Sequence, residues 1–131
     1  MKKFTLSVCT LLILNIVSFA TQLSGTYTIN PAAPASTTNF KNIYSAITYM
    51  NGILIGNGGR SDGGPNNSAP FGVSGPVIFN LSPGNYGNEQ VYVIDNVIGN
   101  NAINTITFQK LPGSVGAVIF NKSQEIGRAH V

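Results

Sequence analysis

Few side chains in this chain could carry out chemistry, and those that could are scattered. The 131 residues include four Asp or Glu, one His and one Cys. Asp95 has no acidic partner nearby, and no Asp-Asp cluster occurs, whereas glycoside hydrolysis needs two carboxylates at a controlled separation. Scattered acids also cannot supply the several carboxylates of a calcium site. The residue pattern therefore assigns no catalytic residue, no metal ligand and no cofactor.

Arg60 and Asp62 are the charged residues that invite a binding role, because they lie in a segment rich in Gly and Asn (residues 57–75). The segment lacks the Gly-Lys-Ser/Thr ending of a phosphate loop and the GGxGxD pattern of calcium-binding repeats. It is either a flexible insertion or a ligand-binding loop with these two residues at its tip, since loops often carry binding sites. Arg60 and Asp62 are thus the candidate ligand-binding residues.

The N-terminus has the features of a secretory signal peptide. Lys2 and Lys3 precede the mostly apolar run from Phe4 to Phe19, and Ser18-Phe19-Ala20 places small residues before a cleavage site. The run is short for a membrane span of about 20 residues. Cleavage after Ala20 would remove Cys9, so disulfides and thiol chemistry are excluded from the mature segment. The sequence predicts a protein that is secreted or held at the cell surface, with no membrane span after cleavage.

The C-terminal residues Ile126 to Val131 (IGRAHV) are identical to the translation of a widely used sequencing adapter, and Glu125 fits the same frame. We expect residues 125–131 to be a non-native tail and the natural protein to continue differently. His130, the single histidine, lies in this tail, so no imidazole base or ligand is expected. Between the two ends the net charge is +1, with no basic patch, which argues against a nucleic-acid partner.

Two pairs of strand-like runs stand out between these ends. Val77–Leu81 and Val91–Ile94 alternate apolar side chains with period two and flank the turn Ser82–Asn85. Residues 105–109 and 117–121 repeat the same unit further along the chain. The turn indicates either a reversal of the chain or a corner.

The repeat has a nearly constant period. Val77 and Ile106 are 29 positions apart, and Val91 and Val118 are 27 apart. Such a period predicts a stacked β-solenoid whose inward apolar residues form columns, with Gly99 and the Asn residues after it at the corners. A meander of antiparallel hairpins in a sandwich is the alternative.

A first strand and a helix are predicted before the repeat. Leu23 to Ile29 is strand-like, with Tyr27 and Ile29 on one face. Residues 40–50 carry apolar side chains at helical spacing, after Thr38 or Asn39 as the N-cap and before Gly52 as the terminator. A helix in this place is expected to cap the open end of the stack. The predicted layout is a signal peptide (1–20), an N-terminal strand and capping helix (21–56), the Gly/Asn-rich loop (57–75), the first β-helix turns (76–124) and the tail (125–131).

The segment GPVIFNLSPGNYGNEQVYVI (75–94), followed by NTITFQ (104–109), resembles the first turns of the right-handed parallel β-helix proteins of the pectin-lyase-like superfamily. It is most similar to large secreted surface proteins of Bacteroidota-type bacteria, and LSGTYTI (23–29) and NFKNIYSAITYMN (39–51) are part of the likeness. The resemblance implies an all-β fold that starts a right-handed parallel β-helix with an N-terminal capping α-helix. It also implies that Glu89 bonds backbone groups at a corner.

The resemblance leaves two classes of function open. The first is a non-enzymatic surface protein, structural or adhesin-like, that presents side chains to extracellular glycans or to neighbouring cells. The second is a carbohydrate-active enzyme, a polysaccharide lyase or hydrolase, whose catalytic turns lie beyond the segment given by this sequence. Clustered acidic residues on one strand face further along the chain would favour the enzyme. Monotonous repeats would favour the adhesin.

Overall fold

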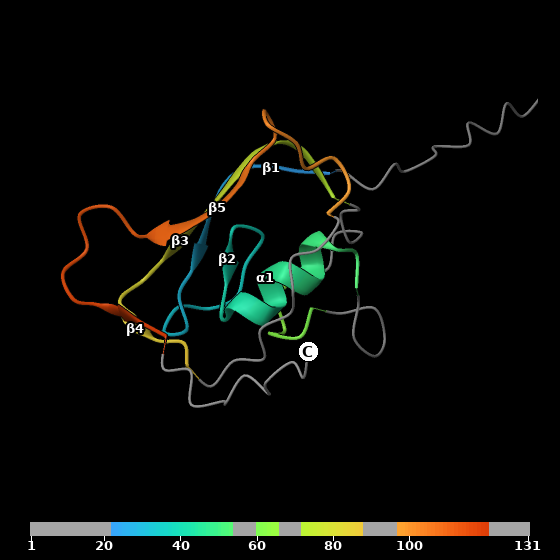
Figure 1. Ribbon diagram of the computed structural model, residues 1–131. Helices are drawn as coiled ribbons and strands as arrows, with labels where there is room; N and C mark the ends of the chain where they lie inside the picture. Colours follow the sequence, from blue (N-terminus) through green and yellow to red (C-terminus); the bar gives the residue numbers. More distant parts are fainter. Residues whose placement is uncertain (1–21, 54–59, 66–71, 88–96, 121–131) are drawn as a thin grey trace, which may run out of the picture.

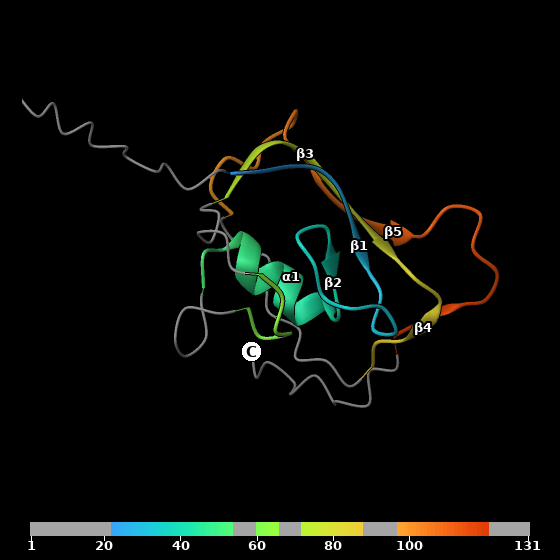
Figure 2. The same cartoon turned by 180° about the vertical axis from the view of Figure 1, so that it is seen from behind.

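The computed structural model describes residues 22–53, 60–65, 72–87 and 97–120. Within these ranges the chain forms six strands and one helix. In chain order they are β1 (Leu23–Ile29), β2 (Asn39–Phe40), α1 (Ile43–Met50), β3 (Val73–Leu81), β4 (Gly84–Asn85), β5 (Ile106–Lys110) and β6 (Val118–Ile119). Figures 1 and 2 show the long strands β1 and β3 arching over α1 and β2.

The strands form two parallel sheets. The larger has the order β2-β1-β3-β5, and the smaller pairs β4 with β6. In the larger sheet Val77 pairs with Ile106 and Phe79 with Phe108, all in parallel, so the register predicted from the offset of 29 residues is confirmed. The predicted partner of Val118, Val91, lies outside the described residues. Within them, Val118 pairs with Gly84.

The Ser82–Asn85 turn is a corner that takes the chain from the first sheet to the second. β3 ends at Leu81 and β4 follows at Gly84, whose N–H donates to the carbonyl of Ala117 beside β6. The corner is held by Tyr86, which is buried and places its hydroxyl 3.0 Å from the carbonyl oxygen of Ile29. The predicted strand 91–94 lies outside the described residues.

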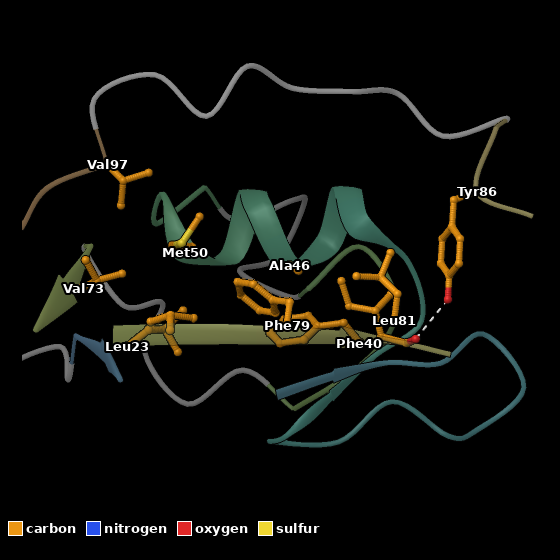
Figure 3. Close-up of a cluster of buried hydrophobic side chains, with 11 residues drawn as sticks. Leu23, Phe40, Ala46, Met50, Val73, Phe79, Leu81, Tyr86 and Val97 are labelled. Atoms are coloured by element: carbon orange, nitrogen blue, oxygen red, sulfur yellow. Dashed lines mark hydrogen bonds between the residues drawn. The ribbon is translucent and has the colours of Figure 1, made fainter. Parts of the chain in front are cut away.

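The core lies between the sheet and the helix. Figure 3 shows Ala46 and Met50 of α1 facing the side chains of the sheet. Period-two alternation on β3 places Val77, Phe79 and Leu81 inside, and burying each such side chain contributes about 1.5–3 kcal/mol. The buried cluster consists of Leu23, Ile29, Phe40, Ala46, Met50, Val73, Val77, Phe79, Leu81, Tyr86 and Val97.

The helix begins later than the sequence indicates. Asn42 is the N-cap, and its side-chain oxygen accepts a hydrogen bond of 2.7 Å from the backbone N–H of Ser45. Thr38 and Asn39 do not cap it, because Asn39–Phe40 pairs with the end of β1 as strand β2. The predicted end is confirmed, since Gly52 follows the C-cap with a φ of 71° that suits glycine.

Candidate functional site

The two candidate ligand-binding residues, Arg60 and Asp62, form an ion pair whose side chains are only 1% and 0% exposed. Arg60 Nη2 lies 2.5 Å from Asp62 Oδ2, and Arg60 Nε lies 3.0 Å from Asp62 Oδ1, so the guanidinium meets the carboxylate with two parallel bonds. We call this pair the Arg60–Asp62 clip. Its burial differs from the exposed loop tip that the sequence indicates.

The guanidinium of Arg60 connects the Gly/Asn-rich segment to the residues before α1. It donates to the carbonyl oxygens of Ser36 and Asn39 at 2.5 and 2.8 Å. Its flat face lies over the ring of Phe40, with 3.9 Å between Arg60 Cζ and the ring centroid, and Tyr49 stands further off at 5.5 Å. A planar cation on an aromatic face combines electrostatic attraction with packing. Four of the five N–H groups of the guanidinium thus donate hydrogen bonds to protein oxygens.

Both oxygens of the Asp62 carboxylate accept hydrogen bonds as well. Besides Arg60 it accepts hydrogen bonds from the backbone N–H groups of Lys41, at 3.0 Å, and Gly64, at 3.1 Å. Burial by itself raises the pKa of the Asp62 carboxyl, but the hydrogen bonds from Arg60, Lys41 and Gly64 outweigh it and hold the pKa below its ordinary value. Each carboxylate oxygen thus has two donors. Ligand binding by Arg60 and Asp62 stays a prediction, and a ligand would have to displace these contacts.

The other residues weighed for chemistry lie outside the described part of the chain. These are Glu89, Asp95, Cys9 and His130. Among the described residues, no three His, Cys, Asp or Glu side chains come together as a metal ion would need. None of the helices in the same ranges is long and apolar enough to span a membrane.

The larger sheet ends at β5, and this end is the second place where the described residues could meet a partner. Val77 N donates to Thr105 O and Leu111 N donates to Leu81 O, so the odd-numbered residues of this stretch face β3. Alternation therefore turns the backbone N–H and C=O groups of Ile106, Phe108 and Lys110 the other way. No described strand pairs with that side. We call it the open edge.

Like side chains stack across the sheet toward the open edge. The rings of Tyr27 and Phe79 are 5.6 Å apart, and those of Phe79 and Phe108 are stacked at 4.8 Å. On the opposite face the amide of Gln109 donates to Asn80 Oδ1 at 2.9 Å. The columns thus run from one strand to the next, and Phe108 and Gln109 are their last described members.

At the open edge Lys110 occupies the position where the neighbouring strands carry aliphatic side chains. Its register partners are Leu81 on β3 and, one strand further, Ile29 on β1, both fully buried or nearly so. Lys110 therefore stands on the core face of the sheet, where the two preceding strands carry aliphatic side chains, and it is exposed. The ion pair found among the described residues is the Arg60–Asp62 clip, so Lys110 has no acidic partner there.

Sequence reasoning did not single out Tyr86, Asn42 or Lys110. A signal existed for Tyr86, because it follows the Pro-Gly-Asn turn directly, where an aromatic hydroxyl can reach backbone groups of the corner. For Lys110 the signal was its position in the repeat, four residues after Ile106 and aligned with Leu81.

Comparison of the chain with protein-family models, with curated proteins and with solved structures finds no match. Among the described residues the chain forms a small parallel sheet, with one short helix and side chains of like type in register across the strands.

Proposed function

We propose that this chain provides the capped first part of a right-handed parallel β-helix in a secreted or cell-surface protein, and that this protein is structural or adhesin-like and binds extracellular glycans. The observation that carries the proposal is the parallel, in-register stacking of β1, β3 and β5 with like residues in columns. Stacked strands of this kind propagate along one axis, which suits a rod that holds binding surfaces away from a cell.

The helix supports the capping role. Ala46 and Met50 are fully buried against the sheet, and Arg60 of the Arg60–Asp62 clip donates to the carbonyl oxygen of Asn39, shortly before the helix. We infer that the helix would also cover the first end of the apolar stack. This arrangement is what a solenoid needs where its first coil has no neighbour.

The outer face of the sheet is the surface that we assign to glycans. Thr26, Thr107 and Gln109 are exposed there and present hydroxyl and amide groups. Such groups donate and accept hydrogen bonds, as sugar hydroxyls require. The enzymatic alternative, a polysaccharide lyase or hydrolase, stays a prediction from the family resemblance, and no contact among the described residues favours it.

The test has an export arm and a binding arm. The full chain with its leader is expressed in a Gram-negative host, and mass spectrometry of the exported protein should show Thr21 as the first residue. The exported protein is then applied to a glycan microarray and incubated with polysaccharides while reducing ends and unsaturated products are measured. Retention on defined glycans without new products supports the proposal. An intact Met1 outside the cell, or polysaccharide cleavage, contradicts it.

A matched pair of variants locates the binding face. Thr107→Val keeps the shape and the strand preference of the residue but removes one exposed hydroxyl, so glycan retention should fall. Val115→Thr changes a side chain that is 94% exposed and lies away from the sheet, and it should leave retention unchanged. Equal retention by both variants would show that the outer face is not the glycan surface.

A further inference from the structure

We propose that the outer face of the larger sheet recognises a neutral polysaccharide, whose sugar rings lie with their C–H faces on Ile78 and whose hydroxyls bond to Thr26, Thr107 and Gln109. This inference rests on the proposed glycan binding and narrows it to uncharged glycans. The observations behind it are the register of three strands, the fixed amide of Gln109 and the neutral character of the described positions on this face.

The register of the sheet brings the contact residues together. Thr26 of β1 pairs with Ile78 of β3, and Ile78 pairs with Thr107 of β5. They alternate with core residues such as Phe79 and so share the outer face, which Figures 1 and 2 show on the outside of the arch over α1. Neighbouring strands lie about 4.8 Å apart, so the two threonines stand about 10 Å apart with Ile78 between them. A further coil beside β5 would extend this face and would not cover it.

Ile78 supplies an apolar platform between two hydroxyl groups. It is half-buried, whereas Thr26 and Thr107 are exposed. A pyranose ring has the matching pattern, because one face carries C–H groups and the rim carries hydroxyls. Contact with Ile78 would remove apolar surface of both partners from water, and the threonine hydroxyls can donate to and accept from the rim.

The amide of Gln109 is held in place beside this platform. Its Nε2 donates to Oδ1 of Asn80, the register partner on β3, at 2.9 Å. Asn80 is only 8% exposed, whereas Gln109 is exposed. The Gln109 amide has a second N–H and the oxygen Oε1, which can donate to and accept from sugar hydroxyls. A side chain that is already fixed loses less conformational freedom when it binds a ligand.

The described positions of the outer face are uncharged, and this selects the class of glycan. The outward side chains that pair in register on the three strands are Thr26, Thr28, Ile78, Asn80, Thr107 and Gln109. Lys110 follows on β5, but it stands on the core face. A uronate carboxylate or a sulfate group would therefore meet neutral side chains, and covering an anion without a counter-charge costs free energy. Neutral glycans avoid this cost.

The probes are pairs of polysaccharides that share sugar, linkage and length but differ in charge. Mannan is paired with mannuronan, in which a carboxylate replaces each hydroxymethyl group, and galactan and glucan are paired with their sulfated forms. Binding of the exported full chain to each is measured by affinity electrophoresis. We expect the neutral member of a pair to bind about ten-fold tighter or more. Its binding should change by less than about two-fold between 0.1 and 1 M NaCl, although the Debye length falls from about 10 to 3 Å.

Variants of the protein test the contact and the charge separately. Ile78→Thr keeps a β-branched side chain but removes apolar surface, so affinity for the neutral glycan should fall about five-fold. Thr107→Lys adds a cation to the face and should tighten binding of the anionic member by about three-fold at low salt. Val115→Lys adds the same charge at a side chain that is 94% exposed and lies away from the sheet, and it should change neither affinity. Ile78 and Thr107 lie outside the buried cluster, so both variants should keep the circular dichroism spectrum of the parent.

The outcomes separate this inference from the proposed function. Tighter binding of the anionic member of a pair, or loss of neutral-glycan binding at high salt, overturns the inference and leaves glycan binding in place. Unchanged binding by Ile78→Thr, or equal effects of Thr107→Lys and Val115→Lys, places the contact elsewhere and overturns it as well. Binding of no glycan contradicts the proposed function and this inference together.

Discussion

Replacing Asp62 with Asn should destabilise the protein strongly, because it leaves the guanidinium of Arg60 buried without a counter-charge. The substitution keeps the size of the side chain and one carbonyl oxygen, which can accept from only one of the N–H groups of Lys41 and Gly64, because these two groups bond different oxygens of Asp62. It removes the charge-assisted, two-bond contact with Arg60, whose side chain is 1% exposed. Breaking a buried ion pair by removing one partner typically costs about 3–5 kcal/mol.

The lower end of that range applies here, about 3 kcal/mol, since Arg60 retains its bonds to the carbonyl oxygens of Ser36 and Asn39 and its contact with Phe40. For a domain of this size, about 3 kcal/mol corresponds to a fall in the midpoint of thermal unfolding of about 12–24 °C. Urea unfolding followed by circular dichroism gives the free energy of unfolding of parent and variant.

A double-mutant cycle tests whether loss of the Arg60–Asp62 ion pair causes the destabilisation by Asp62→Asn. Arg60→Met keeps an unbranched apolar chain over Phe40 and removes the cation. The double variant Arg60→Met/Asp62→Asn contains neither charge, so its loss of stability should be smaller than the sum of the single losses by at least about 1 kcal/mol. Additive losses, or a loss below about 1 kcal/mol for Asp62→Asn, would falsify the view that this pair is buried and coupled.

The same clip predicts how stability depends on pH. The pKa of Asp62 in the folded protein lies below its ordinary value of 3.8, so the folded state favours the carboxylate more than the unfolded state does. The contribution of Asp62 is therefore fully present above the ordinary pKa and is lost as the pH falls through the lower, folded pKa. Asp62→Asn should flatten this acid part of the stability profile, at and below the ordinary pKa of 3.8. An unchanged profile would assign the acid sensitivity to other groups.

Four further substitutions test the corners and the open edge. Gly99→Ala should cost more than about 3 kcal/mol, because φ is 84° and a Cβ would lie 2.0 Å from the carbonyl oxygen of Val73, whereas Gly113→Ala, with φ of 74° and open space, should cost only about 1 kcal/mol; urea unfolding compares them. Tyr86→Phe should cost about 1–2 kcal/mol in the same assay, since the corner loses its buried hydroxyl bonds. Lys110→Leu should increase self-association in sedimentation velocity, because it completes the aliphatic column at the open edge.

The sequence predicted the parts of the fold that follow from local alternation and repetition. The bounds of β1 were predicted as the structure has them, and the pairing of Phe79 with Phe108 followed from matching apolar positions at a fixed offset. Gly52 was a reliable terminator because a left-handed residue after a helix strongly favours glycine. In each case the information lies within a few residues or in a direct comparison of two similar segments.

The start of the helix and the clip were not predictable in this way. Asn39 is a good N-cap residue by type, but it pairs with Thr28 of β1 and its side chain accepts a hydrogen bond of 2.7 Å from the Thr28 hydroxyl. Arg60 has the sequence context of an exposed residue, since glycines and asparagines surround it. Its burial depends on two carbonyl oxygens and an aromatic ring that come from twenty or more residues earlier in the chain. Tertiary contacts, which the local pattern does not encode, decided both positions.

The stacked sheet also contains β1, a strand that the sequence repeat did not include. Strands belong to the same stack when their side chains are in register, even when the number of residues between them differs. Tyr27 and Phe79 are register partners although 52 positions separate them, whereas Phe79 and Phe108 are separated by 29. The chain between β1 and β3 is longer because it contains β2, α1 and the Arg60–Asp62 clip, and α1 lies against the core face of the sheet. A constant sequence offset therefore identifies paired strands only where no such segment is inserted between them. The aromatic column identifies β1 as the first layer because an aromatic ring stands in register with Phe79, whatever the length of chain between them.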